Sequence, residues 1–491
     1  MGNDRRSAVL LRAAYSFAVV LVFLYFLMWK VNFYLAESIK QGVYLFFAPV
    51  LIAGTLYFRG LRDGIEIRLV GIFLTWVVIT RVINGDRVLS GEYLFVLDLA
   101  LMLPVMELGL VLDAAGRRRV LNWLSVILGV YFFALGVLCI LAFLLHTEYI
   151  NPITGAYLAR IINPLTAPMA AVLDTNPNIV AYWFMMPMLL MVYQYFAAAR
   201  GLRRISAVIV FLASFAGVSL TRCRSVKLAL SFSLAVLAVL LVLKLRKGKG
   251  KALTAMLLVF AFLLTLPGVY FGFDACHIGL EHASAFLDES KEARASAAER
   301  ESPAPLAYIA PLASFHPLSA EKTEEAERQD DAITQLNRLS SGRIAIYRAA
   351  FQSIRENPRV LLFGSSGGSL MSRTNELLQD TKAHVHNFLL QSLMLAGIPG
   401  LLIVLTLLFF LFAAAFRLCF GGRAPLSSAV LSLPLFATFV YGQFEAGFFN
   451  FTDARTLFFY LMCGLMLGEY IKYYPRGVAE DRHSAADSAA E

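Results

Sequence analysis

The sequence predicts an all-α polytopic membrane protein with about 12 transmembrane helices and one large extracytoplasmic loop between spans 9 and 10. Of its 491 residues, 59% are hydrophobic and only 16% are charged, which is too apolar for a soluble protein. Apolar runs long enough to cross a hydrocarbon core of about 30 Å recur along the chain. Clusters of Lys and Arg separate some of these runs, as short cytoplasmic loops do in membrane proteins. The net charge of +9 therefore indicates no nucleic-acid partner.

Twelve runs meet this length criterion. They lie near residues 13–31, 42–58, 66–84, 93–113, 120–146, 179–198, 205–221, 226–243, 252–272, 388–416, 426–444 and 456–472. An even number places both termini on one side, together with the basic clusters at 117–119, 200–204 and 244–251, so we expect that side to be cytoplasmic. The predicted order is spans 1–9 in 1–272, the outer loop in 273–387, spans 10–12 in 388–472 and a cytoplasmic tail in 473–491.

The outer loop divides into two unlike halves. Residues 289–329 are rich in Ala, Glu, Ser and Pro, which predicts a mobile or loosely helical segment. Apolar residues then recur at helical spacing from Arg343 to Ile354, which predicts an amphipathic helix. Gly364, Gly367 and Gly368 follow as a tight turn that could offer backbone donors to a phosphate, or serve as an ordinary loop.

Two histidines mark the stretch where this loop enters the tenth span, AHVHNFLLQSLMLAGIPG at 383–400. A histidine can accept a proton near neutral pH, so His384 or His386 could act as a general base. Either could equally be an interfacial residue that is satisfied by water. Asn387 and Gln391 could support the imidazole, and the Gly397–Gly400 segment should bend the helix.

Two arginines form a second candidate. About forty residues separate Arg204 from Lys244, enough for two minimal spans at about 1.5 Å per residue and almost no loop. Arg222 and Arg224 must therefore lie at the outer surface, against the usual charge bias. They could bind a diphosphate through their planar forks, or snorkel to lipid headgroups, as we expect of Lys227.

Further polar residues reach the same outer face under this topology. Asn178 could support the site or cap a helix, and Glu445 could orient an imidazole or face water. The complete set on this face is Asn176, Asn178, Arg222, Arg224, Arg343, His384, His386, Glu445, Asp453 and Arg455. Polar groups that converge at one depth indicate a site. The five cysteines have no paired spacing, so neither a disulfide framework nor a zinc site is expected, and the Cys276–His277 pair is interpreted as incidental.

Four stretches together resemble the O-antigen ligase and polymerase superfamily. These are HVHN with Gln391 and GIPG, DTNPNIVA at 174–181, TRCRS at 221–225, and the segment from SGR at 341 to GSSG at 364. They cover most of the chain from about Asp174 onward. The family hairpin usually reads Ser-Arg, whereas Cys223 precedes Arg224 here, so either Arg222 or Arg224 could hold the family role.

This resemblance implies a membrane glycosyltransferase that moves a glycan from an undecaprenyl-diphosphate carrier to an acceptor hydroxyl. We interpret the enzyme as inverting and independent of a metal or other cofactor, with His386 the first choice of base and His384 the second. Arg222 or Arg224, with Arg343, would hold the departing diphosphate. The acceptor could be a glycan, a lipid or a protein, so ligase and polymerase both stay open. The site is expected on the extracytoplasmic face of a bacterial cytoplasmic membrane.

A transporter or flippase of lipid-linked glycans is the alternative function. Transporters tend to contain internal repeats and ionisable residues near the middle of the bilayer. The two halves of this chain show no convincing self-similarity, and only Asp98 and Glu107 are candidate mid-bilayer carboxylates. A metal-dependent oligosaccharyltransferase would need acidic ligands in the first outer loop, 32–41, which offers only Glu37.

Overall fold

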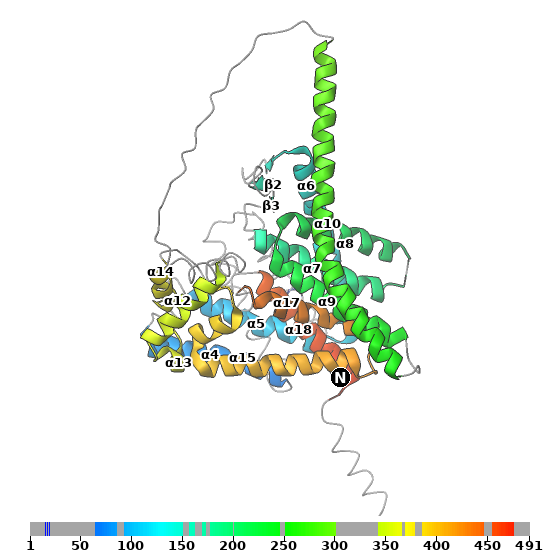
Figure 1. Cartoon of the computed structure of the whole chain (residues 1–491). Coiled ribbons are helices and arrows are strands. Elements are labelled where there is room, and N and C mark those ends of the chain that lie inside the picture. The colour runs from blue at the N-terminus through cyan, green and yellow to red at the C-terminus, as the bar shows by residue number, and fades with distance from the viewer. Residues whose placement is uncertain are drawn as a thin grey trace, which may run out of the picture.

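The computed structural model describes most of the helical part of the chain. Within it the protein is almost entirely helical, as predicted, with one small sheet (Figure 1). The described residues are 15, 17, 19, 64–85, 93–150, 157–162, 169–172, 177–199, 201–245, 251–300, 342–365, 369–378, 385–445 and 454–475.

In chain order the elements are α4 (Ile65–Ile83), α5 (Tyr93–Val111), α6 (Ala114–Leu145), β1 (Tyr149–Ile150), β2 (Tyr157–Ile162), β3 (Met169–Val172), α7 (Pro177–Ala197), α8 (Gly201–Thr221), α9 (Arg224–Leu245), α10 (Lys251–Arg300), α12 (Arg343–Glu356), α13 (Val360–Phe363), α14 (Ser369–Leu378), α15 (Phe388–Phe420), α16 (Leu426–Ala429), η1 (Val430–Ser432), α17 (Leu433–Gly442) and α18 (Ala454–Tyr473). The helices α4 to α9, α15 and α18 each lie close to a predicted apolar run. The first two predicted spans lie almost wholly outside the described residues.

Six of the described helices are long and apolar enough to cross a membrane: α6, α7, α8, α9, residues Leu253–Asp288 of α10, and α15. Two shorter apolar helical stretches, Met102–Val111 and Leu426–Gly442, fall within further predicted spans. The protein is therefore a multi-pass membrane protein, and the count of twelve spans stays a prediction.

The helix α7 forms the centre of the bundle. Every side chain from Val180 to Tyr193 is buried, so this helix touches protein on all sides. Its neighbours include α6, α8 and α9. An ion pair joins the start of α6 to the end of α18. Arg117 Nε lies 3.1 Å from Glu469 Oε1, and Ser428 Oγ donates to Glu469 Oε2 at 2.9 Å. This buried ion pair links α6, α16 and α18, and removing one partner would leave an uncompensated charge.

The sheet is the part of the fold that the hydropathy pattern did not predict. β1, β2 and β3 pair in that order as antiparallel strands, with Ala159 opposite Val172. The strands follow α6 and lead into α7, where the sequence was interpreted only as a connection between spans.

The helix α10 does not end at residue 272. It continues without interruption to Arg300, and Figure 1 shows its second half projecting beyond the bundle. His146, at the end of α6, lies beside this helix: its Nε2 is 2.9 Å from both Ser284 Oγ and Asp288 Oδ2. The segment that was expected to start the outer loop is therefore helical as far as Arg300.

The predicted bend in α15 occurs at Gly397, where φ is +67° and ψ is −171°. A Cβ there would lie 2.6 Å from the carbonyl oxygen of Leu362, and a Cβ on Gly364, whose φ is +65°, would lie 2.4 Å from the backbone of Leu395. The two backbones thus touch directly, and only glycine fits at either crossing. The Gly364 turn therefore has a packing role at the bend of α15, while Gly367 and Gly368 lie outside the described residues.

The bend sets the first turns of α15 beneath the predicted amphipathic helix, which is α12. Ile346, Ala350 and Ile354 of α12 form a small apolar cluster with Val385, Leu390 and other residues of that region. Figure 1 shows α12, α13 and α14 gathered at one end of α15. This packing brings one face of α12 to the residues that precede α15, where His386 lies.

Candidate active site

His386 occupies a strained turn just before α15. Its φ is +51°, a left-handed conformation that costs a non-glycine residue about 1–3 kcal/mol. Hydrogen bonds on both sides hold the turn: the N–H of Val385 donates to Gln391 Oε1 at 3.2 Å, and Asn387 Oδ1 caps α15 by accepting from the N–H of Leu390 at 3.0 Å. Asn387 and Gln391 thus fix the backbone of the histidine rather than its ring.

Tyr347 of α12 ties the same turn to the end of α17. Its hydroxyl donates to the carbonyl oxygen of His386 at 3.1 Å and lies 3.3 Å from the carbonyl oxygen of Gln443. The same Gln443 oxygen also accepts a hydrogen bond from Asn387 Nδ2 at 3.1 Å. Burial, more than any other influence, raises the pKa of Tyr347 above its ordinary value, so its hydroxyl keeps the proton that it donates. Helical spacing placed Tyr347 on the buried face of α12, but no sequence signal indicated this contact.

Glu445 lies against the ring of His386. Its side chain is only 5% exposed, and Oε2 is 3.0 Å from His386 Nδ1. The other oxygen, Oε1, accepts from Asn178 Nδ2 at 3.3 Å and faces Arg343 Nη2 at 3.5 Å. Arg343 also donates from Nε to the carbonyl of Phe444 at 3.1 Å. A buried carboxylate is thus surrounded by an imidazole, a guanidinium and an amide.

This arrangement suits proton transfer. A carboxylate on Nδ1 selects the tautomer with the proton on Nδ1, stabilises the imidazolium that forms, and assigns the role of base to Nε2. Asn178 and Arg343 in turn hold the carboxylate in one orientation. The four side chains come from α7, α12, the turn before α15 and the segment after α17, so the fold brings together groups that are distant in sequence.

The two arginines lie at the predicted turn between α8 and α9. Arg222 has a φ of +54°, and Arg224 is the exposed first residue of α9. Between them, Cys223 is buried, and burial is the main reason that the pKa of its thiol is raised; the Glu445 carboxylate raises it further. The turn therefore lies within electrostatic reach of Glu445.

A second polar network on α10 approaches Arg222. Glu281 Oε1 lies 3.7 Å from Arg222 Nη2 and 3.1 Å from Nε2 of His277, which is 2% exposed. The Cys276–His277 pair was interpreted as incidental, and the ring of His277 lies beside the carboxylate that pairs with Arg222. Lys227 does not snorkel to lipid headgroups: it is 4% exposed, and its Nζ lies 2.5 Å from Asp274 Oδ1, so a carboxylate on α10 takes their place.

The structure brings together some of the predicted polar residues and separates others. His386, Asn387, Gln391, Arg343, Asn178 and Glu445 come together around one turn, and Arg222 and Arg224 lie on a neighbouring one. His384, Asn176 and Asp453 lie outside the described residues. Arg455 is buried and donates to the hydroxyl of Tyr441 at 2.6 Å. In the described part of the chain, no three His, Cys, Asp or Glu side chains are grouped to hold a metal ion.

Comparison with known proteins gives one match. Residues 209–405, less than half of the chain, match the family model described as O-Antigen ligase. No curated protein and no solved structure matches the chain significantly. The matched range contains Arg222, Arg224, Arg343 and His386, whereas Asn178 and Glu445 lie outside it and are connected to it by the contacts described above.

Proposed function

We propose that this chain, a member of the O-antigen ligase and polymerase superfamily, transfers a glycan from an undecaprenyl-diphosphate carrier to an acceptor hydroxyl. The observation that carries the proposal is the 3.0 Å contact between His386 Nδ1 and the buried carboxylate of Glu445. The reaction takes place on the extracytoplasmic face of the bacterial cytoplasmic membrane. The acceptor is a second glycan, a lipid or a protein, which makes the enzyme a polymerase or a ligase of a surface polysaccharide.

In the proposed reaction, Nε2 of His386 removes the proton from the acceptor hydroxyl while its oxygen bonds to the anomeric carbon of the donor glycan. The bond between that carbon and the diphosphate oxygen breaks, and its electron pair leaves with the carrier. Attack opposite to the leaving group inverts the configuration at the anomeric carbon. The imidazolium, stabilised by Glu445, then gives its proton to solvent.

The diphosphate leaves as an anion, so it requires positive charge close by. Arg222 and Arg224 supply that charge, and arginines can replace a divalent ion at a diphosphate because their guanidinium groups stay charged and donate several hydrogen bonds. The contacts of Arg343 with Glu445 and the carbonyl of Phe444 favour a different task for it. Arg343 orients the carboxylate, and so positions the base.

The choice between the two histidines rests on the partner of His386. A buried carboxylate at Nδ1 fixes the orientation and the tautomer of the ring, so that Nε2 is the nitrogen that accepts a proton. His386 is therefore the base that we propose, and His384 stays the second choice.

The test is transfer by the purified protein in proteoliposomes that contain a fluorescent lipid-linked oligosaccharide. We expect labelled glycan on a new acceptor, inverted anomeric configuration in the product, and the same rate with EDTA present. Fluorescent lipid that crosses between leaflets without forming a new bond would identify a transporter instead. Loss of transfer in EDTA, restored by a divalent ion, would exclude the metal-independent reaction.

A further inference from the structure

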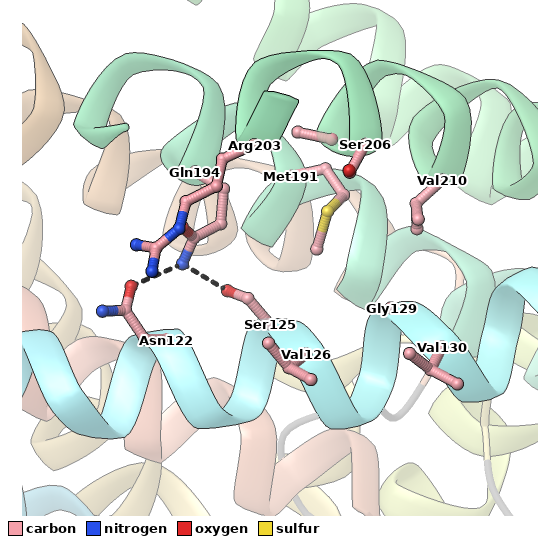
Figure 2. A pocket seen from close by; sticks show the side chains of 11 residues that line it. Asn122, Ser125, Val126, Gly129, Val130, Met191, Gln194, Arg203, Ser206 and Val210 are labelled. Carbon is pink, nitrogen blue, oxygen red and sulfur yellow. Dashed lines mark hydrogen bonds between the residues drawn. The ribbon is translucent and has the colours of Figure 1, made fainter. Parts of the chain in front are cut away.

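A pocket opens between α6, α7 and α8 at the end of these helices that lies away from the candidate active site (Figure 2). Its volume is about 290 Å³. Asn178 lies in the first turn of α7 at the active site and Gln194 lies in its last turn at the pocket, so sixteen positions, roughly 24 Å of helix, separate the two places. In a membrane, this distance puts the pocket in the opposite leaflet.

The inner wall of the pocket is polar. Gln194 Nε2 donates to Asn122 Oδ1 at 2.9 Å and to Ser125 Oγ at 3.0 Å, so the carbonyl oxygen of Asn122 is occupied and its amide group turns its donors outward. Figure 2 shows the guanidinium of Arg203, from the first turn of α8, beside Asn122. Among the residues that the structure describes, neither the guanidinium nor the Asn122 amide nitrogen has a hydrogen-bond acceptor. A cation and an amide donor side by side fit an anionic oxygen.

Two neighbouring arginines, Arg118 and Arg204, already donate hydrogen bonds to the protein backbone. Arg118 Nη2 donates to the carbonyl of Ala197 at 3.5 Å, and Arg204 Nε donates to that of Ala198 at 3.2 Å while its guanidinium lies over the ring of Tyr195. These two side chains cap the carboxyl end of α7, as cations at helix ends do. Arg203 differs from both because it points into the pocket.

The mouth of the pocket is apolar and exposed on the surface of the protein. Val126 and Val130 of α6 line the mouth and are 58% and 67% exposed. Because α6 is long and apolar enough to span a membrane, these two side chains would meet lipid there. An acyl chain would cover them, whereas a free phosphate would not. The exposed residues Arg119 and Arg203 lie at this same end, where they favour anionic headgroups.

We propose that this pocket binds one glycerophospholipid of the leaflet opposite to the candidate active site. Arg203 and Asn122 donate to its phosphate, and one acyl chain lies along Val126 and Val130. A volume near the lower limit of small-molecule pockets fits a headgroup and the first part of one chain, not a whole lipid.

The test is native mass spectrometry of the delipidated full chain during titration with phosphatidylglycerol. Because a charge-assisted hydrogen bond is lost, we expect Arg203→Gln to weaken binding roughly 10- to 100-fold. The matched control Arg204→Gln removes the same charge next to it and should stay within about threefold of the wild type, a difference typical of exposed charges. Val126→Trp, which keeps the guanidinium but fills the path of the acyl chain, should also weaken binding. Arg203→Gln and Val126→Trp should unfold at the wild-type temperature, because both positions are exposed, whereas Arg204→Gln also removes a cap of α7 and should unfold at a slightly lower temperature.

Three results would overturn the proposal. Equal binding by the wild type and Arg203→Gln would remove the arginine from the site. Equal losses in Arg203→Gln and Arg204→Gln would mean that the bulk charge of this surface, not a pocket, attracts the lipid. Competition by glycerol 3-phosphate at the concentration at which the lipid binds would identify a free-anion site. None of these results depends on glycosyl transfer, so the proposed function is tested separately.

Discussion

At the scale of single residues, three non-glycine residues in the described part of the chain have a positive backbone φ: His146, Arg222 and His386. Two of them are candidate site residues on different turns. Such conformations persist only where surrounding contacts enforce them, and they concentrate at functional sites. At His386 these contacts are the hydrogen bonds made by Tyr347, Asn387 and Gln391, which hold the turn so that the imidazole lies against Glu445.

The pair of His386 and Glu445 should act as a unit. We expect His386→Ala to lower turnover about 10²- to 10⁴-fold with nearly unchanged affinity for the lipid-linked donor, since a general base acts only as the bond forms. Glu445→Gln, which keeps the shape but removes the charge, should lower turnover in the same range. The double variant should be little worse than His386→Ala, because the two effects are not additive.

The matched control for Glu445→Gln is Glu356→Gln, which removes a carboxylate from the exposed end of α12, where Arg373 Nε is its 2.8 Å partner. It should keep wild-type turnover, because exposed ion pairs contribute little. Full activity of the His386→Ala/His384→Ala double variant would exclude histidine as the base.

The arginine turn should affect binding and turnover together. Arg224→Ala should raise the KM for the donor and lower kcat, because a diphosphate clamp acts in the ground state and in the transition state. Arg224→Lys should recover part of both, since a point charge cannot replace a planar fork. The same pair of variants at Arg222 identifies which arginine contacts the diphosphate, and unchanged kinetics at both positions would exclude the clamp.

Tyr347 offers a test of how the strained turn is held. Tyr347→Phe keeps the ring but removes the hydroxyl that bonds to the carbonyls of His386 and Gln443. We expect stability to fall by about 1 kcal/mol and kcat to fall with KM unchanged. Because the raised pKa keeps the wild-type hydroxyl protonated, the kcat ratio of wild type to variant should be constant from pH 6 to about pH 9. A change in KM alone would assign the hydroxyl to substrate binding.

At the scale of elements, the bend in α15 decides where the candidate base lies. Gly397→Ala would force a Cβ to within 2.6 Å of the Leu362 carbonyl oxygen and strain a positive φ. We expect a loss of about 1–3 kcal/mol or more from the strain alone, measured as a lower unfolding temperature in detergent, and a lower kcat. Gly268→Ala in α10, where a Cβ would meet nothing within 4 Å, is the control and should be neutral or slightly stabilising. Equal effects of the two changes would mean that the bend is not rigidly specified.

Much of this level of structure could be predicted from the sequence. Apolar runs predicted the positions of α4 to α9, α15 and α18, and the residues Gly-Ile-Pro-Gly predicted the bend at Gly397, because these signals are local. The sheet at 149–172 and the extension of α10 to Arg300 were missed. Short strands and a polar helix end carry no long apolar run, so a search for membrane spans has nothing to detect there.

At the scale of the whole molecule, the orientation of the chain is open to direct labelling. In a Cys276→Ala background, which removes the one half-buried native thiol, a cysteine at position 314 should react with a membrane-impermeant thiol reagent on intact cells. A cysteine at position 248 should react only after the membrane is permeabilised. The opposite pattern would place the candidate active site on the cytoplasmic side.

The site itself was predictable in its residue types but not in its contacts. A common outer face was expected for Asn178, Arg343, His386 and Glu445 from the topology. The sequence left open whether Glu445 orients an imidazole or faces water, because that depends on the exit angle of α17 and on the bend in α15. Tyr347 could not be singled out among the apolar residues of its helix, since its hydroxyl acts through a tertiary contact only.

The wide spacing of these residues has a consequence for how the protein is made. Asn178 and Glu445, which share a hydrogen bond, are 267 positions apart. At a synthesis rate of about 5–20 residues per second, Asn178 is translated roughly 13 to 53 seconds before its partner. During that interval Arg343 and His386 also emerge without the carboxylate that orients them. The nascent chain therefore inserts its helices with an inactive set of side chains, and the acid–base pair forms only after the segment that follows α17 has been delivered to the membrane.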